Sequence, residues 1–344
     1  MNVGISLSAS CDSMLQIYFA EFKDSLGALR KSMKNQLASA FRPGTAANQK
    51  RQMSLYLSFC DNYGLSAVNP SVDTICIYVA FLTNKFKSAQ SVENYMSGVR
   101  FMHNCIDTKA PALDSFELKL MIRAAKLIMR RLPNRRLPFS VDDLIKLVSL
   151  CKYMGYLGHI MKVAILFGYY GMLRQSNLAP PSIDQFDITR HTCRGDVIIH
   201  APGLVIIAKW SKTNQSFEQL PLIPIPCVPG SPLDPVKAYN DMLHEIPSKS
   251  INDPLLMKAP GKPITVTQLR DTFRTMLELC DMDPARYSLH SLRRTGATMC
   301  WHAGVHAVDI QRHGTWSSSA FMDYIMSTNV QKSPVAIALK NISN

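Results

Sequence analysis

The chain has 344 residues, of which 47% are hydrophobic and 18% are charged. That length exceeds one compact core of usual size, so we expect two domains, each burying its own apolar interior. No run of about eighteen or more apolar residues occurs, and residues 1–10 lack the basic and apolar regions of a secretion signal. These features argue against a membrane or secreted protein and favour one of the cell interior.

The formal net charge of +13 is unevenly placed along the chain. Residues 1–140 carry 18 Lys and Arg against 9 Asp and Glu, a net charge of +9, which leaves +4 for the remainder. This imbalance suits a basic solvated surface, but it favours a polyanionic partner, most commonly nucleic acid. The 9 cysteines form no C-x-x-C pair and no His/Cys cluster at zinc spacing, so we expect reduced thiols and no bound metal.

The first part of the chain is predicted to be a small helical bundle. Residues 14–40 place apolar side chains on one helix face, which packs on its own domain or contacts a neighbouring protomer. Thr45 is expected to cap a second helix that ends at Gly64. Further helices are predicted over 72–86, from Ser91 and over 116–129.

A basic segment with two prolines, over 131–139, is predicted to be a linker, because prolines stop helices and clustered arginines stay solvated. Beyond it, Ser140 and Asp143 start a helical stretch that runs to Leu178. Strands of a short antiparallel sheet are predicted over 197–200, 204–210 and 217–223, and helices near Pro235, Thr265, Ser291, Val305 and Ser318.

Three basic side chains form the first group of candidate site residues. Arg174 ends an apolar run that should be buried, so an anion is its expected partner, with a salt bridge to a distant acid as the alternative. His290 and Arg293 lie three residues apart on one helical turn and suit a single phosphate. An H-x-x-R pattern by itself occurs by chance in many helices.

A lysine and a tyrosine complete the candidate set. Lys212 lies in the predicted turn between two strands, where its ammonium can reach a leaving oxygen as a general acid. Lys209 is its rival if the strand slips, and either side chain by itself is more often a solvated lysine. Tyr324 follows Trp316 near the end of the chain, where a lone tyrosine is more often a core or interface residue than a nucleophile.

The order of these residues is more specific than any one of them, because together it resembles the catalytic domain of the tyrosine recombinases, the family of phage integrases and Cre recombinase. The set is Arg174, Lys212 in a turn, His290 with Arg293, Trp316 after a glycine, and Tyr324. Three stretches look most like the eukaryotic enzymes of Crypton and DIRS-type mobile elements. They are 168–174, 210–213 and 316–321.

The resemblance implies a mainly α fold with a small antiparallel β-sheet, arranged as a two-domain C-shaped clamp. Its catalytic domain corresponds to 140–326, and the family's helical core-binding domain to 45–130. Residues 1–44 are then an N-terminal extension, and residues 327–344 a C-terminal tail that suits exchange between protomers.

The resemblance also implies a role for each basic residue of the set. Arg174 and Arg293 would clamp the scissile phosphate and stabilise the charge growing on its oxygens. Lys212 would protonate the leaving 5′ oxygen, and His290 would assist proton transfer. No metal or other cofactor is required for this chemistry.

Tyr324 would attack phosphorus and keep the bond energy in a 3′-phosphotyrosine, while Trp316 would take the place of a second histidine. Two departures from the family pattern stand out. Asn177 replaces an acid, so we expect the orientation of Arg174 to come from elsewhere, and the interval from Trp316 to Tyr324 is one residue shorter than in Cre-like members.

The implied function is site-specific recombination of double-stranded DNA in mobile-element integration or excision, by a dimer on one site and a tetramer in the synapse. Type IB topoisomerase-like relaxation and DNA binding without catalysis are the alternatives. The resemblance places the protein in the nucleus of a eukaryotic cell, with no membrane partner. Residues expected to bind DNA are Lys50, Arg51, Arg100, Arg123, Lys126, Arg135, Arg136, Lys209 and Arg294.

Overall fold

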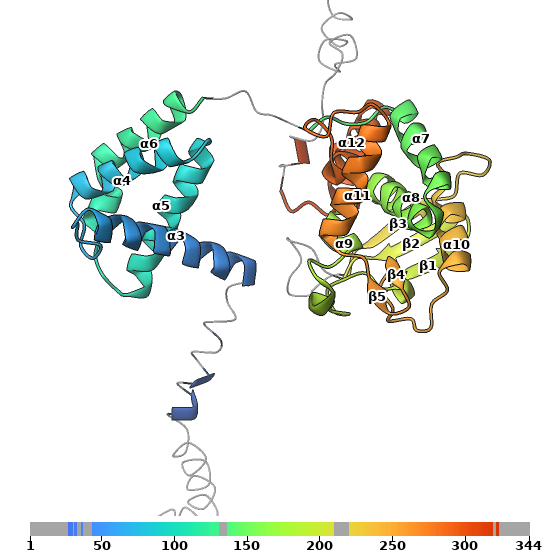
Figure 1. Cartoon of the computed structure of the whole chain (residues 1–344), viewed down its shortest axis with the longest axis horizontal. Helices are drawn as coiled ribbons and strands as arrows, with labels where there is room; N and C mark the ends of the chain where they lie inside the picture. Colours follow the sequence, from blue (N-terminus) through green and yellow to red (C-terminus); the bar gives the residue numbers. More distant parts are fainter. Residues whose placement is uncertain are drawn as a thin grey trace, which may run out of the picture. The chain divides into compact units, whose positions relative to one another are not determined.

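The computed structural model describes residues 27–29, 31–32, 36, 43–130, 136–209, 220–318 and 321–322. The chain divides into two compact units, Met1–Pro133 and Asn134–Asn344, whose boundary falls in the segment predicted to be a linker (Figure 1). Predictions for Lys212, Tyr324, Arg135 and the C-terminal tail lie outside the described residues, as does most of the N-terminal extension.

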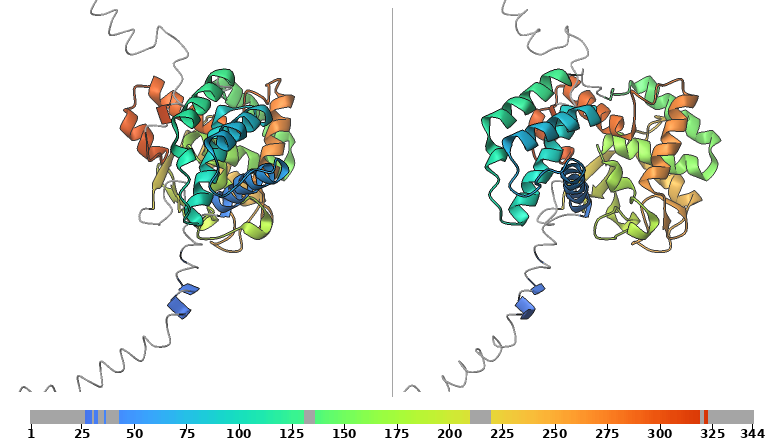
Figure 2. Two further views of the ribbon diagram at one scale, coloured as in Figure 1. Left: turned by 90° about the vertical axis from the view of Figure 1, so that its left-hand side faces the viewer. Right: turned by 60° about the vertical axis from the view of Figure 1, so that its left-hand side comes forward.

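The first unit is a bundle of helices, which both views of Figure 2 show gathered around one interior. Its elements are α3 (Pro43–Asn62), α4 (Val72–Lys85), α5 (Ala89–Cys105), the 3-10 turn η1 (Pro111–Asp114) and α6 (Phe116–Ile128). Tyr56, Ile75, Leu82, Val92 and Leu118 are fully buried and come from four different helices, so they close the core. Burial of such side chains contributes about 1.5 to 3 kcal/mol each.

Two predicted helix starts in this unit are wrong. The helix expected to begin at Thr45 begins at Pro43, because a proline has no N–H and is accommodated in the first turn, where that N–H would be unpaired. The helix expected to open at Ser91 begins earlier, because the side chain of Ser88 accepts the backbone N–H of Ser91 at 3.3 Å and caps it. Gly64 follows the end of α3 with a φ of +61°, as predicted.

The second unit is built around α8 (Gly155–Tyr170), a helix whose residues from Ile160 to Gly168 are nearly all buried. It contacts α7 (Val141–Leu150), α10 (Pro235–Glu245) and α12 (Leu289–His302), and it runs through the middle of the unit (Figure 1). An apolar surface on all sides suits a central helix. The other helices that the structure describes in this unit are α9 (Gln175–Leu178), α11 (Val266–Leu279) and α13 (Ala307–His313), with 3-10 turns η2 (Cys151–Tyr153), η3 (Ile183–Gln185) and η4 (Arg194–Asp196).

The main sheet is antiparallel, in the order β1-β2-β3, with β1 (Val197–His200), β2 (Gly203–Ile207) and β3 (Leu222–Pro226). The third strand was predicted over 217–223 but runs from Leu222 to Pro226, and the second, predicted over 204–210, ends at Ile207. Pro224 and Pro226 argue against a central strand, but β3 is an edge strand, where a missing N–H is tolerated. A second sheet, β4 (Met257–Ala259) with β5 (Lys262–Pro263), was not predicted.

The start of the second unit is fixed to α12 and to the loop before it. The guanidinium of Arg136 donates to the carbonyls of Pro284 and Tyr287 at 2.6 and 3.1 Å, and the Arg294 guanidinium donates to the carbonyl of Arg136. Phe139 stacks on Tyr287 with ring centroids 4.7 Å apart. The capping box predicted for α7 then follows directly.

Within the described ranges, none of the helices combines the length and the apolar character needed to cross a bilayer. The same ranges bring together no three His, Cys, Asp or Glu side chains that suit a metal ion. Every cysteine among them is a free thiol, and burial raises the pKa of Cys151 to about 12.

Candidate active site

Arg174 lies in the turn between α8 and α9. The central helix ends at Tyr170, and the backbone then passes through Met172, whose φ of +47° is unusual for a side chain of this size. Arg174 precedes the first residue of α9, and the apolar run before it is buried as predicted, but that run is helical only as far as Tyr170. The side chain of Arg174 is half-buried, because the turn brings it to the edge of the core.

Asn177 fixes the backbone of Arg174. The side-chain oxygen of Asn177 accepts the N–H of Arg174 at 3.1 Å, and the N–H of Asn177 donates back to the Arg174 carbonyl at 2.8 Å. An amide oxygen therefore caps this short helix without adding a negative charge next to the guanidinium. The guanidinium itself is held by a different residue: Nη1 of Arg174 donates to the hydroxyl of Thr315 at 3.3 Å.

Arg293 is one of the most buried side chains of the chain, with 2% exposure. Its guanidinium donates to the carbonyl of Met172, two residues before Arg174 in the chain, and to the carbonyl of Gly314 at 2.5 Å. The ring of Trp316 covers the guanidinium at 3.9 Å from its centroid. Carbonyl dipoles and an aromatic face compensate for the lost hydration of this charge.

His290 lies on α12 one turn before Arg293, as predicted, but the two side chains differ in exposure. His290 is exposed, whereas Arg293 is buried, although the surrounding protein still removes part of the water around the imidazole. That desolvation, followed by the positive charges of Arg293, Arg174 and Arg294, lowers the pKa of His290 from 6.5 to about 4. The imidazole is therefore neutral near pH 7 and can accept a proton, and an anion placed among these cations would raise its pKa.

Gly314 and Trp316 form a tight turn after α13. A Cβ on Gly314 would meet the ring of Trp316 at 1.7 Å, so only glycine fits below this indole. The N–H of Trp316 donates to the carbonyl of Gln311 at 3.0 Å, and the side chain of Gln311 donates back to the carbonyl of Trp316 at 3.2 Å. The turn is thus fixed on both sides of Thr315.

The turns after α8 and α13 are joined by a third contact besides those of Arg174 and Arg293. Nε2 of His313 donates to the carbonyl of Tyr170 at 2.7 Å. Met172 in one turn and Thr315 in the other have φ values of +47° and +54°. Strained backbone of this kind concentrates at functional sites, which marks the junction as a candidate site.

The structure therefore brings four of the six predicted catalytic residues to one place, namely Arg174, His290, Arg293 and Trp316. Lys212 and Tyr324 lie outside the described residues. Sequence reasoning missed Thr315, which it treated as the spacer of a glycine-x-tryptophan pattern. It also missed the main-chain carbonyls of Met172 and Gly314, because every residue has a carbonyl and its identity does not show which one accepts a hydrogen bond.

Lys209, the rival general acid, is engaged elsewhere. Its ammonium forms an ion pair with Asp196 at 2.7 Å and donates to the carbonyl of Ile188 at 2.8 Å. Both partners of the ion pair are mostly buried, with side-chain exposures of 21% and 10%. Lys209 thus ties the end of the central strand to the preceding turn, which argues against its predicted role in DNA binding.

Other predicted DNA contacts are also engaged within the protein. Arg136 and Arg294 hold the start of the second unit, as described above. In the first unit, Arg100 pairs with Asp114 at 2.7 Å, and Lys126 pairs with Glu93 at 2.6 Å. Both pairs are exposed enough to open at a small cost in free energy. The side chains of Lys50, Arg51 and Arg123 are exposed on α3 and α6.

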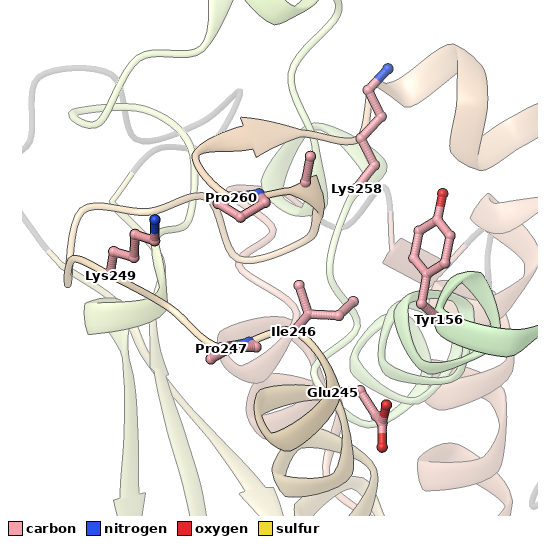
Figure 3. Close-up of a pocket in the computed structure, with 8 residues that line it drawn as sticks. Tyr156, Glu245, Ile246, Pro247, Lys249, Lys258 and Pro260 are labelled. Atoms are coloured by element: carbon pink, nitrogen blue, oxygen red, sulfur yellow. The ribbon is translucent and has the colours of Figure 1, made fainter.

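A cavity of about 270 Å³ lies at a separate place, where α8, the end of α10 and β4 meet (Figure 3). Figure 3 shows the Tyr156 ring and the Lys258 chain reaching it from different elements. Its lining comprises Tyr156, Glu245, Ile246, Pro247, Lys249, Lys258, Ala259 and Pro260. None of the predicted site residues belongs to it, so the site around Arg293 is distinct from this cavity.

Comparison by sequence finds no relative: no family model matches the chain, and no curated protein does. Solved structures match over most of its length. The Tn1549 transposon integrase in complex with transposon right end DNA superposes with a TM-score of 0.60 at 14% identity, covering 91% of this chain and 98% of the other. A lambda integrase dimer bound to a COC′ core site gives 0.55 at 13% identity, covering 88% and 96%.

A lambda integrase tetramer bound to a Holliday junction gives 0.55 at 12% identity, covering 93% of this chain and 90% of the other. At these identities the likeness is one of fold. The prediction of a mainly helical protein with a small antiparallel sheet is confirmed, and the chain has the tyrosine recombinase catalytic domain fold of these integrases.

Proposed function

We propose that the protein is a tyrosine recombinase that cuts and rejoins duplex DNA through a 3′-phosphotyrosine at Tyr324, in the integration or excision of a mobile element. The observation that carries the proposal is the junction of the turns at Met172 and Gly314, where the two guanidiniums of Arg174 and Arg293 form a cationic cluster beside the neutral imidazole of His290. A DNA phosphate is the anion that such a cluster suits.

The two arginines act differently in this proposal. Arg174 is half-buried, so its guanidinium reaches the nonbridging oxygens of the scissile phosphate. Arg293 lies behind it and contributes a fixed positive charge in a medium of low dielectric constant, where a charge acts more strongly than in water. Arg293 also holds the turn that places Arg174, by donating to the carbonyl of Met172.

The chemical step is a displacement at phosphorus. The phenolic oxygen of Tyr324 forms a bond to phosphorus, and the bond from phosphorus to the 5′ oxygen breaks. Neutral His290 accepts the phenolic proton, and Lys212 gives a proton to the leaving 5′ oxygen. Lys212 is preferred to Lys209 because the ammonium of Lys209 is committed to Asp196. Attack by the 5′ hydroxyl of a second strand reverses the step without ATP.

Duplex DNA is the proposed partner, gripped through its phosphates by exposed basic side chains such as Lys50, Arg51 and Arg123. We infer a dimer on one site and a tetramer in the synapse, the assemblies that the lambda integrase structures contain. The stretch 168–174 supports an affiliation with Crypton and DIRS-type enzymes and hence a nuclear location.

A covalent-trapping assay tests this function. DNA that the protein binds is selected from a random library, and a nick is placed so that the cleaved fragment diffuses away. The wild-type chain is expected to form a DNA adduct that survives denaturation, whereas Tyr324→Phe forms none and Arg174→Lys forms far less. An adduct that persists in Tyr324→Phe would overturn the proposal. Relaxation of supercoiled DNA by a monomer would point instead to topoisomerase-like activity.

A further inference from the structure

Thr315 has a backbone conformation that its side chain disfavours. Its φ of +54° lies in the left-handed region, where glycine and asparagine are at ease and a β-branched side chain is strained. The turn itself does not need a threonine, because Gly314 already supplies the close approach to the indole. A strained side chain that the fold does not require points to a role for its functional group.

The position of the Thr315 hydroxyl is fixed from both sides. The carbonyl of Gly314 is bound by Arg293, and the N–H of Thr315 donates to the carbonyl of Arg312 at 3.0 Å. The backbone of Trp316 is held by two further hydrogen bonds with Gln311. The hydroxyl is therefore a rigid acceptor for Nη1 of Arg174, 3.3 Å away.

We propose that Thr315 is a positioning residue, whose hydroxyl holds the guanidinium of Arg174 beside His290 and in line with the scissile phosphate. The proposal rests on the recombinase function proposed above. A hydroxyl suits this task better than a carboxylate would, because it orients the guanidinium without neutralising the charge that must bind the phosphate.

Three substitutions separate the hydroxyl from the other properties of Thr315. Thr315→Val keeps the shape and the strained backbone but lacks the hydroxyl. Thr315→Ser keeps the hydroxyl with a smaller side chain. Thr315→Gly removes both the hydroxyl and the strain, so it should fold at least as stably as the wild type. A purely structural role predicts that Thr315→Gly performs as well as the wild type.

The first readout is the titration of His290 by NMR in the full chain without DNA. Arg174 is one of the charges that lower the pKa of His290, so a guanidinium released by Thr315→Val or Thr315→Gly should let that pKa rise. Thr315→Ser should leave it at the wild-type value. In an Arg174→Met background the Thr315→Val substitution should add nothing, because the charge that it releases is already gone.

The second readout is the rate of adduct formation on saturating nicked DNA. Loss of the hydroxyl removes one hydrogen bond of a charged donor, so Thr315→Val and Thr315→Gly should slow the chemical step by about tenfold. Their affinity for DNA should stay close to that of the wild type, and Thr315→Ser should restore the rate.

The two readouts distinguish a failure of the recombinase function from a failure of the positioning role. If the wild type forms no adduct through Tyr324, the recombinase function is lost, while the titration still decides whether Thr315 holds Arg174. If Thr315→Val leaves the titration of His290 unchanged, or if Thr315→Gly reacts at the wild-type rate, the positioning role is overturned.

Discussion

Arg174 and Arg293 carry the same guanidinium in different surroundings. Arg174 is half-buried at the edge of the core, and its guanidinium donates to the hydroxyl of Thr315. Arg293 is 2% exposed and bridges the carbonyls of Met172 and Gly314 beneath an indole. One arginine is therefore placed to bind an anion, and the other to build the place where it binds.

This difference predicts that substitution of Arg293 costs more folding stability than substitution of Arg174. Arg293→Lys leaves a buried carbonyl without its donor and removes the flat contact with Trp316, so it should lower the free energy of unfolding by about 2 to 4 kcal/mol. Arg174→Lys should lower it by only about 1 kcal/mol, because the half-buried side chain gives up a hydrogen bond to Thr315 but keeps its charge. Urea unfolding measures both, and equal losses would contradict the assignment.

His290 gives the site a dependence on pH. Its pKa is about 4 in the folded chain against an ordinary value of 6.5, so protonation favours the unfolded state. Its contribution to stability is complete above pH 6.5, is lost as the pH falls toward 4, and is constant below that. His290→Gln should therefore lose less stability than the wild type between pH 7.5 and pH 5, which unfolding at the two pH values measures.

An equal loss of stability in His290→Gln and the wild type between these pH values would show that His290 titrates normally.

The sequence predicted that His290 and Arg293 share a helical turn, and they do, but spacing does not tell which of them is buried. The role of Thr315 was beyond prediction, because it depends on a φ of +54° and on a turn that comes from a different part of the chain.

Two helices that begin with a capping box were predicted well, whereas the start of α5, which Ser88 caps, was not. Ser140 with Asp143 and Thr265 with Gln268 form capping boxes at the starts of α7 and α11, because local hydrogen bonds decide where these helices begin. The strand β3 was misplaced, because its prolines are allowed only by its position at the sheet edge, which depends on the tertiary fold.

Lys209 and Lys212, which both follow β2 in the sequence, should respond differently to substitution. Lys209→Met leaves the carboxylate of Asp196 without its ammonium, so it should lower the unfolding free energy by about 1 to 3 kcal/mol. Lys212→Ala should leave stability unchanged and slow cleavage by about 10² to 10⁴-fold. DNA with sulfur in place of the leaving 5′ oxygen should restore the Lys212→Ala rate, because a thiolate leaves without protonation.

Rescue of Lys209→Met by that substrate, with none for Lys212→Ala, would reverse the assignment of the general acid. The matched pair is informative because Lys209 is held by Asp196 and by the carbonyl of Ile188, so its substitution should affect folding rather than proton transfer.

At the scale of the whole molecule, the uneven charge predicted a polyanionic partner, and the division into two units falls within the predicted basic linker. Charge along a sequence does not reveal which cations are already paired. Arg136 and Arg294 hold the start of the second unit by donating to carbonyls, whereas Arg51 is exposed on α3.

The salt dependence of DNA binding distinguishes these arginines. Arg51→Ala should reduce the slope of log K against log salt by about one unit, because one phosphate contact is lost. Arg136→Ala should leave that slope unchanged while it lowers the thermal stability of the second unit. A reduced slope for Arg136→Ala would show that its guanidinium reaches DNA.

The most direct test of the account is to identify the atom that joins the protein to DNA. After trapping on a nicked site, the protein is digested with protease and nuclease, and the modified peptide is sequenced by mass spectrometry. We expect a nucleotide linked through its 3′ phosphate to Tyr324, with the 5′ end released as a hydroxyl. A nucleotide on another residue, or a link through the 5′ phosphate, would contradict the account.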